Sequence, residues 1–303
     1  MILITGATGF LGKRVEKKLK SLGLQYYSTS LSLGIDLRDS IQTEKLFKEV
    51  NPDIILNCAA YVGGIQFGYK HPAELFTNNL LMTLNLLEMS KKFEVKRIVN
   101  PISNCAYPAK AKLFKEEEFW DGPLHESVVF YGFARKASYI GSLAYNKQYG
   151  LDQVNLILSN MFGPEDHFDE ERSHAMGALI MKIVDAYRKN LPSVVVWGSG
   201  KPVREWLYVD DGAEAMIRAM SIRPYSEPIN IGVAKGISVI DMAMMIKKIV
   251  GYKGEIVFDI SKPDGATYKT VDGTLGKKLL GWEPLIGFEE AITKTIEWYC
   301  KNK

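Results

Sequence analysis

The sequence predicts an α/β protein with a doubly wound parallel sheet of the Rossmann type and a smaller mixed α/β lobe. An apolar strand at 2–5 runs directly into glycines at positions 6, 9 and 12 and then into a helix. Strands and helices then alternate through the first half of the chain, which is typical of a parallel sheet covered on both faces. With 303 residues, 47% of them hydrophobic, the chain can bury one large core or two interlocked ones.

Apolar periodicity gives the elements in order. The first helix is indicated by Leu11, Val15 and Leu19 at helical spacing, and Gly23 ends it. The expected strands are 2–5, 25–28, 53–57, 97–100 and 153–159, with helices at 11–22, 40–50, 73–92 and 131–149. Beyond residue 160 come loops rich in Gly, Pro, Asp and His, a helix at 174–189 and a strand at 193–197.

The pattern predicts a domain boundary that the chain crosses more than once. The segment 206–219 and a strand at 228–232 are expected to rejoin the first domain. The dinucleotide-binding domain is therefore predicted to contain 1–160 and about 206–235, and the smaller lobe 161–205 and 236–303.

Composition narrows the functional classes. A formal net charge of +3 is mild for this length, so no nucleic acid is expected as a partner. The three cysteines, Cys58, Cys105 and Cys300, are widely spaced and indicate neither a disulfide framework nor a metal site. No apolar run approaches the roughly 20 residues of a membrane span, and a strand beginning at residue 2 leaves no room for a signal peptide, so we expect a cytoplasmic protein without a membrane partner.

The three glycines predict a dinucleotide site. Gly6 permits the tight turn, Gly9 lets the backbone approach a pyrophosphate, and Gly12 lets the helix pack on the strand. The helix N-terminus offers unpaired N–H groups to the anion. An ordinary tight turn is the alternative reading. The other residues of this turn expected to contact the cofactor are Thr8, Phe10 and Leu11.

The end of the second strand favours NADP(H) over NAD(H). An NAD site usually has a carboxylate there for the ribose 2′-hydroxyl, whereas this chain has hydroxyl residues, Ser28 among them, and no acid at 26–30. Asp36 is a candidate acceptor for the adenine amino group, although a helix cap or turn would use it equally well. Small residues after the next strand would let a flat cofactor lie there, or would simply pack tightly. The remaining expected cofactor contacts are Leu37, Ala59, Ala60, Tyr61 and Asn160.

A second motif, Tyr131-Gly-Phe-Ala-Arg135-Lys136, resembles the extended short-chain dehydrogenase/reductases. Their catalytic set is a Ser or Thr, a Tyr, and a Lys four residues after the Tyr; the resemblance implies Ser103 and Tyr131 here. The Tyr donates a proton to a carbonyl oxygen while the nicotinamide delivers hydride. This chain has Arg135 at the lysine position, and Lys136 is about 140° from Tyr131 around the helix, too far to substitute at ~100° per residue. Arg135 keeps the charge but cannot deprotonate.

A closer resemblance, to the GDP-L-fucose synthase family, covers nearly the whole chain. The motifs that carry it are Tyr61-Val-Gly-Gly-Ile65, Ser103-Asn-Cys105-Ala-Tyr-Pro108, Asn160-Met-Phe-Gly-Pro164, Arg172-Ser-His174, Val196-Trp-Gly-Ser-Gly200, Arg204-Glu-Trp-Leu-Tyr-Val-Asp-Asp211 and Ser261-Lys-Pro-Asp-Gly265. Members use NADPH to reduce the C4 ketone of a GDP-linked 4-keto-6-deoxy sugar after epimerisation at C3 and C5. The resemblance implies this fold, this cofactor and a GDP-linked 4-keto sugar as the substrate.

Carried over by residue, the resemblance makes Cys105 and His174 the acid and base of epimerisation. A reductase that receives an already epimerised ketone could keep both as substrate contacts. Alternatively, Cys105 could be a small buried residue and His174 a helix cap. The resemblance also implies Trp197, Arg204 and Lys269 as substrate contacts, and Lys182 stands where the family has Arg.

The departures at Arg135 and Lys182, with Asn104 in the Ser103 loop, leave the sugar open, and a heptose would suit the same plan. Two alternatives remain: a nucleotide-sugar 4-epimerase or dehydratase, and a non-catalytic dinucleotide-binding protein. A dehydratase would be expected to carry Thr-Asp-Glu in the loop that begins at Ser103, and this loop lacks it. Helices 73–92 and 131–149 have apolar residues on more than one face, which predicts a homodimer.

Overall fold

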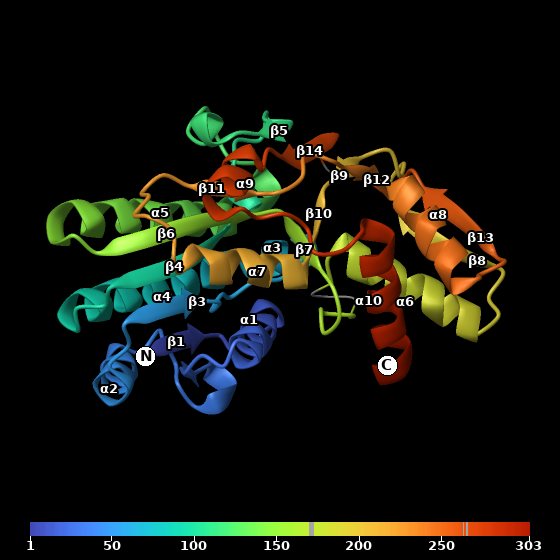
Figure 1. Ribbon diagram of the computed structural model, residues 1–303. Coiled ribbons are helices and arrows are strands. Elements are labelled where there is room, and N and C mark those ends of the chain that lie inside the picture. Colours follow the sequence, from blue (N-terminus) through green and yellow to red (C-terminus); the bar gives the residue numbers. More distant parts are fainter. Residues whose placement is uncertain (170–172, 263, 265) are drawn as a thin grey trace.

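The computed structural model describes residues 1–169, 173–262, 264 and 266–303. Figure 1 shows a larger part built on one twisted sheet and a smaller part beside it that ends in the C-terminal helix. The motif residues Arg172, Pro263 and Gly265 lie outside the described residues.

The larger part confirms the doubly wound parallel sheet. Its six strands lie in the order β11-β6-β4-β3-β1-β2, and every neighbouring pair is parallel. The strands are β1 (Ile2–Thr5), β2 (Tyr26–Ser28), β3 (Ile54–Asn57), β4 (Arg97–Ser103), β6 (Asp152–Leu158) and β11 (Ile229–Ile231). The carboxyl ends of parallel strands share one edge, which is where ligands of such sheets bind.

Alternation along β1 explains why helices cover both faces. Leu3 belongs to a core with helices α2 (Ser40–Val50) and α4 (Pro72–Lys92), whereas Ile4 belongs to a core with α1 (Phe10–Ser21) and α7 (Val209–Ala219). Successive side chains of a strand point to opposite faces, so a strand apolar at both positions needs helices on each side. Helix α5 (Val129–Tyr149) packs along α4.

Among the described residues, three short sheets lie outside the six-stranded one. A four-stranded sheet has the order β12-β9-β14-β5, and the pairs β10-β7 and β13-β8 stand separately. The strands are β5 (Leu113–Phe114), β7 (Asn160–Phe162), β8 (Ser193–Trp197), β9 (Val203–Arg204), β10 (Trp206–Tyr208), β12 (Ile237–Ser238), β13 (Glu255–Asp259) and β14 (Tyr268–Val271). Strand β5 comes from the first half of the chain yet pairs with β14, so the two parts share a sheet.

The remaining helices complete the molecule. Helices α6 (Ala175–Arg188), α8 (Val239–Val250) and α10 (Phe288–Asn302) pack on one another in the smaller part. The shorter ones are α3 (Ile65–Lys70) and α9 (Thr274–Leu280), with single 3-10 turns at η1 (Leu31–Leu33), η2 (Asn104–Ala106), η3 (Glu116–Glu118) and η4 (Glu126–Val128). The expected long elements begin and end within two residues of the observed ones, except the β4 strand, which runs on to Ser103.

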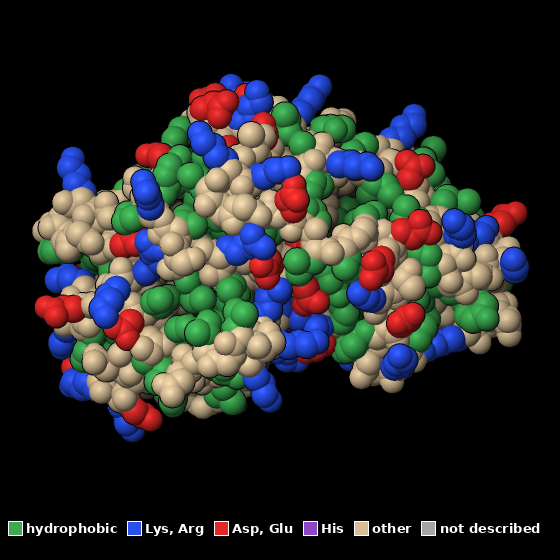
Figure 2. Space-filling view, viewed as in Figure 1, with side chains coloured by type: hydrophobic (Ala, Val, Ile, Leu, Met, Phe, Trp, Pro, Cys, Tyr) green, Lys and Arg blue, Asp and Glu red, His purple; other side chains and the backbone are tan. Residues whose placement is uncertain are grey.

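Acidic and basic side chains are interspersed over the face seen in Figure 2. Among the described residues, no helix is both long and apolar enough to cross a membrane. The cysteines Cys58, Cys105 and Cys300 are free thiols.

Candidate functional site

The glycine turn between β1 and α1 has the geometry of a phosphate cradle. Gly6 has a φ of +61°, a left-handed conformation that favours glycine. A Cβ on Gly12 would lie 2.1 Å from the carbonyl oxygen of Gly6, so the helix approaches the turn too closely for any side chain. Gly9 caps α1 without a side-chain hydrogen bond, and the first turn of that helix, Phe10 and Leu11 included, has no acidic residue. Its amide groups are therefore available to an anion.

A cluster of three hydroxyl groups lies beside this turn. The Oγ1 atom of Thr8 is 2.9 Å from Ser30 Oγ and 2.7 Å from Ser32 Oγ, and the two serine oxygens are 3.0 Å apart. We call Thr8, Ser30 and Ser32 the hydroxyl cluster. Ser32 was not among the predicted contacts; the polar run after the second strand was the available signal.

One carboxylate comes closer to the second strand than expected. Ser28 donates a hydrogen bond of 2.7 Å to Glu16 Oε1, which projects from α1. The segment 26–30 itself contains no acid, as predicted, but the packing of α1 beside β2 supplies one from elsewhere in the chain. The sequence of the strand does not reveal this carboxylate, because the contact depends on how the helix packs.

The predicted adenine-side residues lie along the neighbouring loops. Asp36 accepts two hydrogen bonds from Arg38 Nε and Nη2 at 2.8 and 2.7 Å, and this guanidinium is the main cause of the lowered pKa of that carboxyl. Leu37 is buried, and its carbonyl accepts from Asn85 at 2.8 Å.

The residues after β3 are held against the turn. A Cβ on Gly6 would lie 2.7 Å from Ala59 Cα, so Ala59 forms the floor of the turn, with Ala60 next along the chain. The backbone N–H and C=O of Tyr61 are bonded by the Asn79 side chain at 3.1 and 2.8 Å.

The predicted catalytic residues Ser103, Cys105 and Tyr131 converge at the carboxyl end of β4. Ser103 is the last residue of the strand, and its Oγ accepts a hydrogen bond of 3.2 Å from the Cys105 amide. Tyr131 lies in the first turn of α5, which packs on η2 so closely that a Cβ on Gly132 would be 2.5 Å from the Cys105 carbonyl oxygen. Burial raises the pKa of the Tyr131 phenol, and the positive charge of Arg135 opposes that rise.

Arg135 and Lys136 point to different surroundings, as the helical spacing predicts. Arg135 is 4% exposed; its Nη2 donates to the carbonyl of Pro101, and its Nε has no hydrogen-bond partner among the described residues. The ammonium of Lys136 lies 4.5 and 4.4 Å from the ring centroids of Phe119 and Trp120, and it donates to the Phe119 carbonyl at 2.5 Å. Arg135 is therefore the cation that acts on Tyr131, and Lys136 is held elsewhere.

His174 is the residue immediately before α6. The residue is exposed to solvent on one side. Desolvation of the imidazole by the surrounding protein is the main cause of its lowered pKa, and the charge of His167 lowers the pKa further. Lys182 lies two turns further along the same helix.

Two lysines lie near the ring of Trp197. Its ring is 57% exposed, and the ammonium groups of Lys182 and Lys262 lie 5.8 and 5.6 Å from its centroid. Lys182 Nζ also donates to the Val195 carbonyl at 3.2 Å. Lys262 was missed from sequence: it follows β13 three residues after Asp259, the register partner of Trp197.

Arg204 and Lys269 are register partners on β9 and β14. Burial lowers the pKa of both side chains, and Cys105 lies near enough to Lys269 to oppose the shift in the lysine. Two cations and the Cys105 thiol are thereby brought into one region. Asn160, at the start of β7, directs its amide to the Glu205 carbonyl at 3.2 Å.

The model of a known family, described as the NAD dependent epimerase/dehydratase family, matches residues 2–232. The chain is 33% identical to a GDP-L-fucose synthase of Escherichia coli (strain K12), covering 100% of this chain and 97% of that protein. A GDP-6-OMe-4-keto-L-xylo-heptose reductase from C. jejuni superposes with a TM-score of 0.92 at 27% identity, covering 100% and 98% of the two chains. A GDP-L-fucose synthetase from Naegleria fowleri bound to NADP superposes with a TM-score of 0.90 at 30% identity, covering 99% and 94%.

Proposed function

This chain belongs to the NAD dependent epimerase/dehydratase family and, within it, to the GDP-L-fucose synthase family, and from this premise we propose that it is an NADPH-dependent reductase of a GDP-linked 4-keto sugar. The ketone reduced is the one at C4 of a 6-deoxyhexose or heptose. The observation that carries the proposal is the place of Tyr131 in the first turn of α5, which packs on the Ser103–Cys105 turn at the carboxyl end of β4, with the charge of Arg135 opposing the rise in the pKa of the phenol.

The residues of the site fit the dinucleotide. The close approach at Gly12 and the uncapped start of α1 suit a pyrophosphate, and the buried Nε of Arg135 has an unused donor for the nicotinamide ribose. The hydroxyls of the cluster bond one another, and by rotating their O–H groups they would donate to a 2′-phosphate instead. These features support NADP(H) as the cofactor. We assign further residues to the same cofactor site. Asp36 and Leu37 would contact the adenine, and the rest of the dinucleotide would be contacted by Ala59, Ala60, Tyr61 and Asn160.

The reduction needs one hydride and one proton. Bound NADPH supplies the hydride to C4. Tyr131 donates its phenolic proton to the C4 oxygen, which becomes a hydroxyl, while Ser103 Oγ donates a hydrogen bond to the same oxygen and orients it. Burial alone would make the phenol too weak an acid, so the charge of Arg135 is needed to bring its pKa down.

The substrate is held by the smaller lobe. Trp197 presents an exposed aromatic face for guanine or sugar, with Lys182 beside it. Arg204 and Lys269 are half-buried cations suited to the diphosphate. Because both side chains are half-buried, water hydrates their charges only in part. Binding an anion would offset the free-energy cost of burying these charges.

We assign Cys105 and His174 to proton transfer at the carbons beside the ketone, or, in a reductase supplied with an epimerised sugar, to contacts with it. The two assignments predict different exchange of hydrogen between the sugar and the solvent. If Cys105 transfers protons, deuterium from solvent enters the sugar with wild-type enzyme and fails to enter with Cys105→Ser. Deuterium incorporation that survives this substitution would exclude Cys105 as an essential epimerisation group.

NADPH oxidation at 340 nm tests the reductase. GDP-4-keto-6-deoxymannose and the equivalent GDP-4-keto-heptose would be compared, each with and without prior C3/C5 epimerisation. We expect turnover on at least one, and a loss of roughly 10²- to 10⁴-fold for Tyr131→Phe, the usual contribution of a general acid. An enzyme that binds these sugars but oxidises no NADPH would contradict the proposal.

We further propose a homodimer in a reducing, cytoplasmic compartment. Helices α4 and α5 pack on each other, the rings of Phe76 and Phe133 meet between them, and both helices expose large apolar side chains: Phe76, Leu81, Leu84, Phe133 and Ile140. Burying them against a second copy would remove a patch that monomers rarely expose. Sedimentation showing a monomer at assay concentration would exclude the dimer. We also retain the two-lobe division at 1–160 with 206–235, and 161–205 with 236–303.

A further inference from the structure

Glu205 lies at a junction of the two lobes. It stands between β9, in the four-stranded sheet, and β10, in the pair with β7. Its amide donates to the Lys269 carbonyl at 3.1 Å, and its carbonyl accepts from Ser159 Oγ and Asn160 Nδ2, both at 3.2 Å. The backbone of this one residue therefore joins the strand of Lys269 to the end of the cofactor sheet.

The carboxylate of Glu205 adds a second bond to β14 and extends the junction to one more segment, the chain after β11. The side chain is buried, and Oε1 accepts from the Val233 amide at 2.7 Å while Oε2 accepts from the Val271 amide at 2.8 Å. A Cβ on Gly232 would lie 2.5 Å from Oε1, so the chain after β11 needs glycine to make this approach. Both oxygens are used: the bond to Val271 reinforces the pairing of β9 with β14, and the bond to Val233 ties the segment after β11 to that pair.

Two of the substrate residues are attached directly to this junction. Arg204 precedes Glu205 in the chain, and Lys269 lies two residues before Val271, on the strand that Glu205 holds. We propose that Glu205 is a positioning residue that fixes Arg204 and Lys269 at the spacing the diphosphate requires. This inference rests on the proposed function, because it concerns the same GDP-sugar site.

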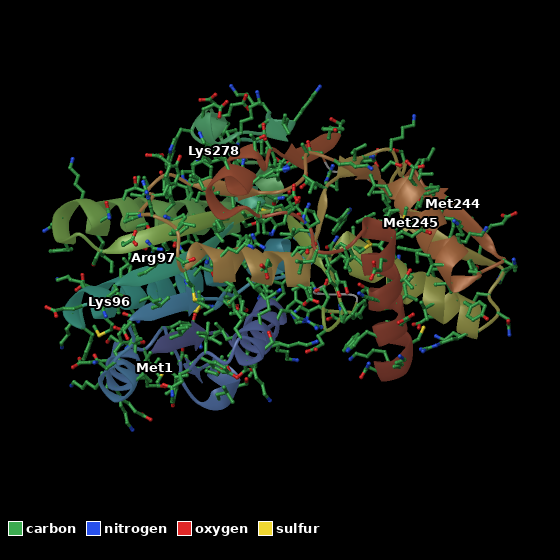
Figure 3. All side chains as sticks on the ribbon, viewed as in Figure 1. Met1, Lys96, Arg97, Met244, Met245 and Lys278 are labelled. Carbon is green, nitrogen blue, oxygen red and sulfur yellow. The ribbon has the colours of Figure 1, made fainter. Side chains whose placement is uncertain are left out.

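A cavity of about 540 Å³ lies against the junction. Its lining includes Glu205, Trp206, Asp211, Phe288 and Met245, the last labelled on α8 in Figure 3. Asp211 is also a buried carboxylate; it accepts from the Leu285 amide at 2.7 Å and holds the chain that enters α10. Within the described part of the chain, no hydrogen bond or ion pair joins Asp211 to Arg204 or Lys269, so it is a control for burial and for backbone capping.

Glu205→Gln tests the inference with little change in size. The amide nitrogen of Gln cannot accept from a backbone N–H, so one of the two bonds is lost. We expect the KM for the GDP-4-keto sugar and the Kd for free GDP to rise about tenfold, as for loss of one bond to a charged group, with kcat changed less than about threefold and the KM for NADPH unchanged. Asp211→Asn keeps an oxygen that can accept from the Leu285 amide, and it should leave the Kd for GDP as in wild type.

Chemical rescue separates positioning from packing. Glu205→Ala opens space beside the cavity, and acetate should then restore GDP affinity, because its oxygens can accept from Val233 and Val271. Equal rescue by acetamide would attribute the effect to filled volume and would overturn the positioning role.

The outcomes for the two proposals differ. Suppose the wild-type enzyme reduces a GDP-4-keto sugar and Glu205→Gln binds GDP as tightly as wild type does. This result would overturn the inference and leave the proposed function standing. An equal rise in the Kd for GDP in Asp211→Asn would also overturn it. A wild-type protein that neither binds GDP nor reduces a GDP-4-keto sugar would overturn the proposed function, and the inference with it.

Discussion

The residues of the cofactor turn are neighbours in the sequence, whereas those of the substrate lobe come from distant segments of the chain. The turn uses consecutive residues, from Gly6 to Gly12, whose spacing alone dictates the backbone path. The substrate side instead combines Lys182, Trp197 and Lys269 from three elements, and their positions depend on strand register and side-chain bonds across loops. A local site should fail when one atom is added to its backbone, whereas a distributed site should weaken in steps.

Gly12→Ala should have the largest effect. Its Cβ would lie 2.1 Å from Gly6 O and 2.8 Å from Ala7 Cα, and these backbone atoms cannot move without opening the turn. We expect a loss of stability of roughly 1–3 kcal/mol, typical of overpacking, and no detectable NADPH binding by calorimetry. Gly287→Ala in the smaller lobe is the control, because a Cβ there meets nothing within 4 Å. Wild-type NADPH affinity in Gly12→Ala would show that the turn is not the phosphate site.

Arg135→Met should have the next largest effect, and it changes a pH profile. The charge of Arg135 lowers the pKa of Tyr131 against burial, so removing it raises that pKa. The phenol then stays protonated to higher pH, so the alkaline limb of the pH profile of kcat/KM moves to higher pH. At pH 7 the rate should fall roughly 10- to 100-fold, because the phenol is a weaker acid.

Lys136→Met is the matched control for Arg135→Met. It removes the same charge one residue further along α5, beside the rings of Phe119 and Trp120. We expect the alkaline limb to stay in place in this variant. An equal shift in both variants would mean that the profile reports general charge rather than the contact with Tyr131.

The sequence predicted what local geometry decides. The glycine turn, the parallel sheet and the separation of Arg135 from Lys136 all follow from short spacings or from 100° per helical residue. Seven of the described strands were not predicted: β5, β7, β9, β10, β12, β13 and β14. Most have two or three residues, and, unlike the short strands β1, β2 and β3, they do not alternate with long helices that mark them in the sequence.

Side-chain partners that arise from packing were also beyond reach. Glu16 meets Ser28 because α1 lies beside β2, and Lys262 meets Trp197 because β13 pairs with β8. The role of Glu205 was not predicted, because its hydrogen-bond partners come from three other segments of the chain. Such contacts require the three-dimensional arrangement of distant segments.

Ser32→Ala should have a moderate effect on the cofactor side alone. Removing one member of the hydroxyl cluster takes away a donor from the 2′-phosphate and leaves the turn intact. We expect the KM for NADPH to rise about 3- to 10-fold, the equivalent of one hydrogen bond, while the KM for NADH stays unchanged. Ser21→Ala, an exposed hydroxyl at the end of α1, should change neither. Equal losses with NADPH and NADH would place Ser32 away from the 2′-phosphate.

Lys262→Ala should have the smallest effect, because the substrate side shares its charge among several residues. The ammonium lies 5.6 Å from the Trp197 centroid at an exposed position, where such a contact contributes about 0.5–1 kcal/mol. The KM for the GDP-sugar should rise about 2- to 5-fold with kcat unchanged, and Lys182→Ala should act similarly. Lys248→Ala, an exposed lysine of the same lobe, should leave the KM unaltered.

The double variant Lys182→Ala/Lys262→Ala decides whether the two lysines act together. If both ammonium groups act on one ligand across the Trp197 ring, their losses should depart from additivity by more than about 0.5 kcal/mol, as for residues that share a partner. Strict additivity would describe two independent contacts. A tenfold or larger loss from Lys262→Ala alone would break the comparison, because it would make the substrate side as dependent on a single residue as the cofactor turn is on Gly12.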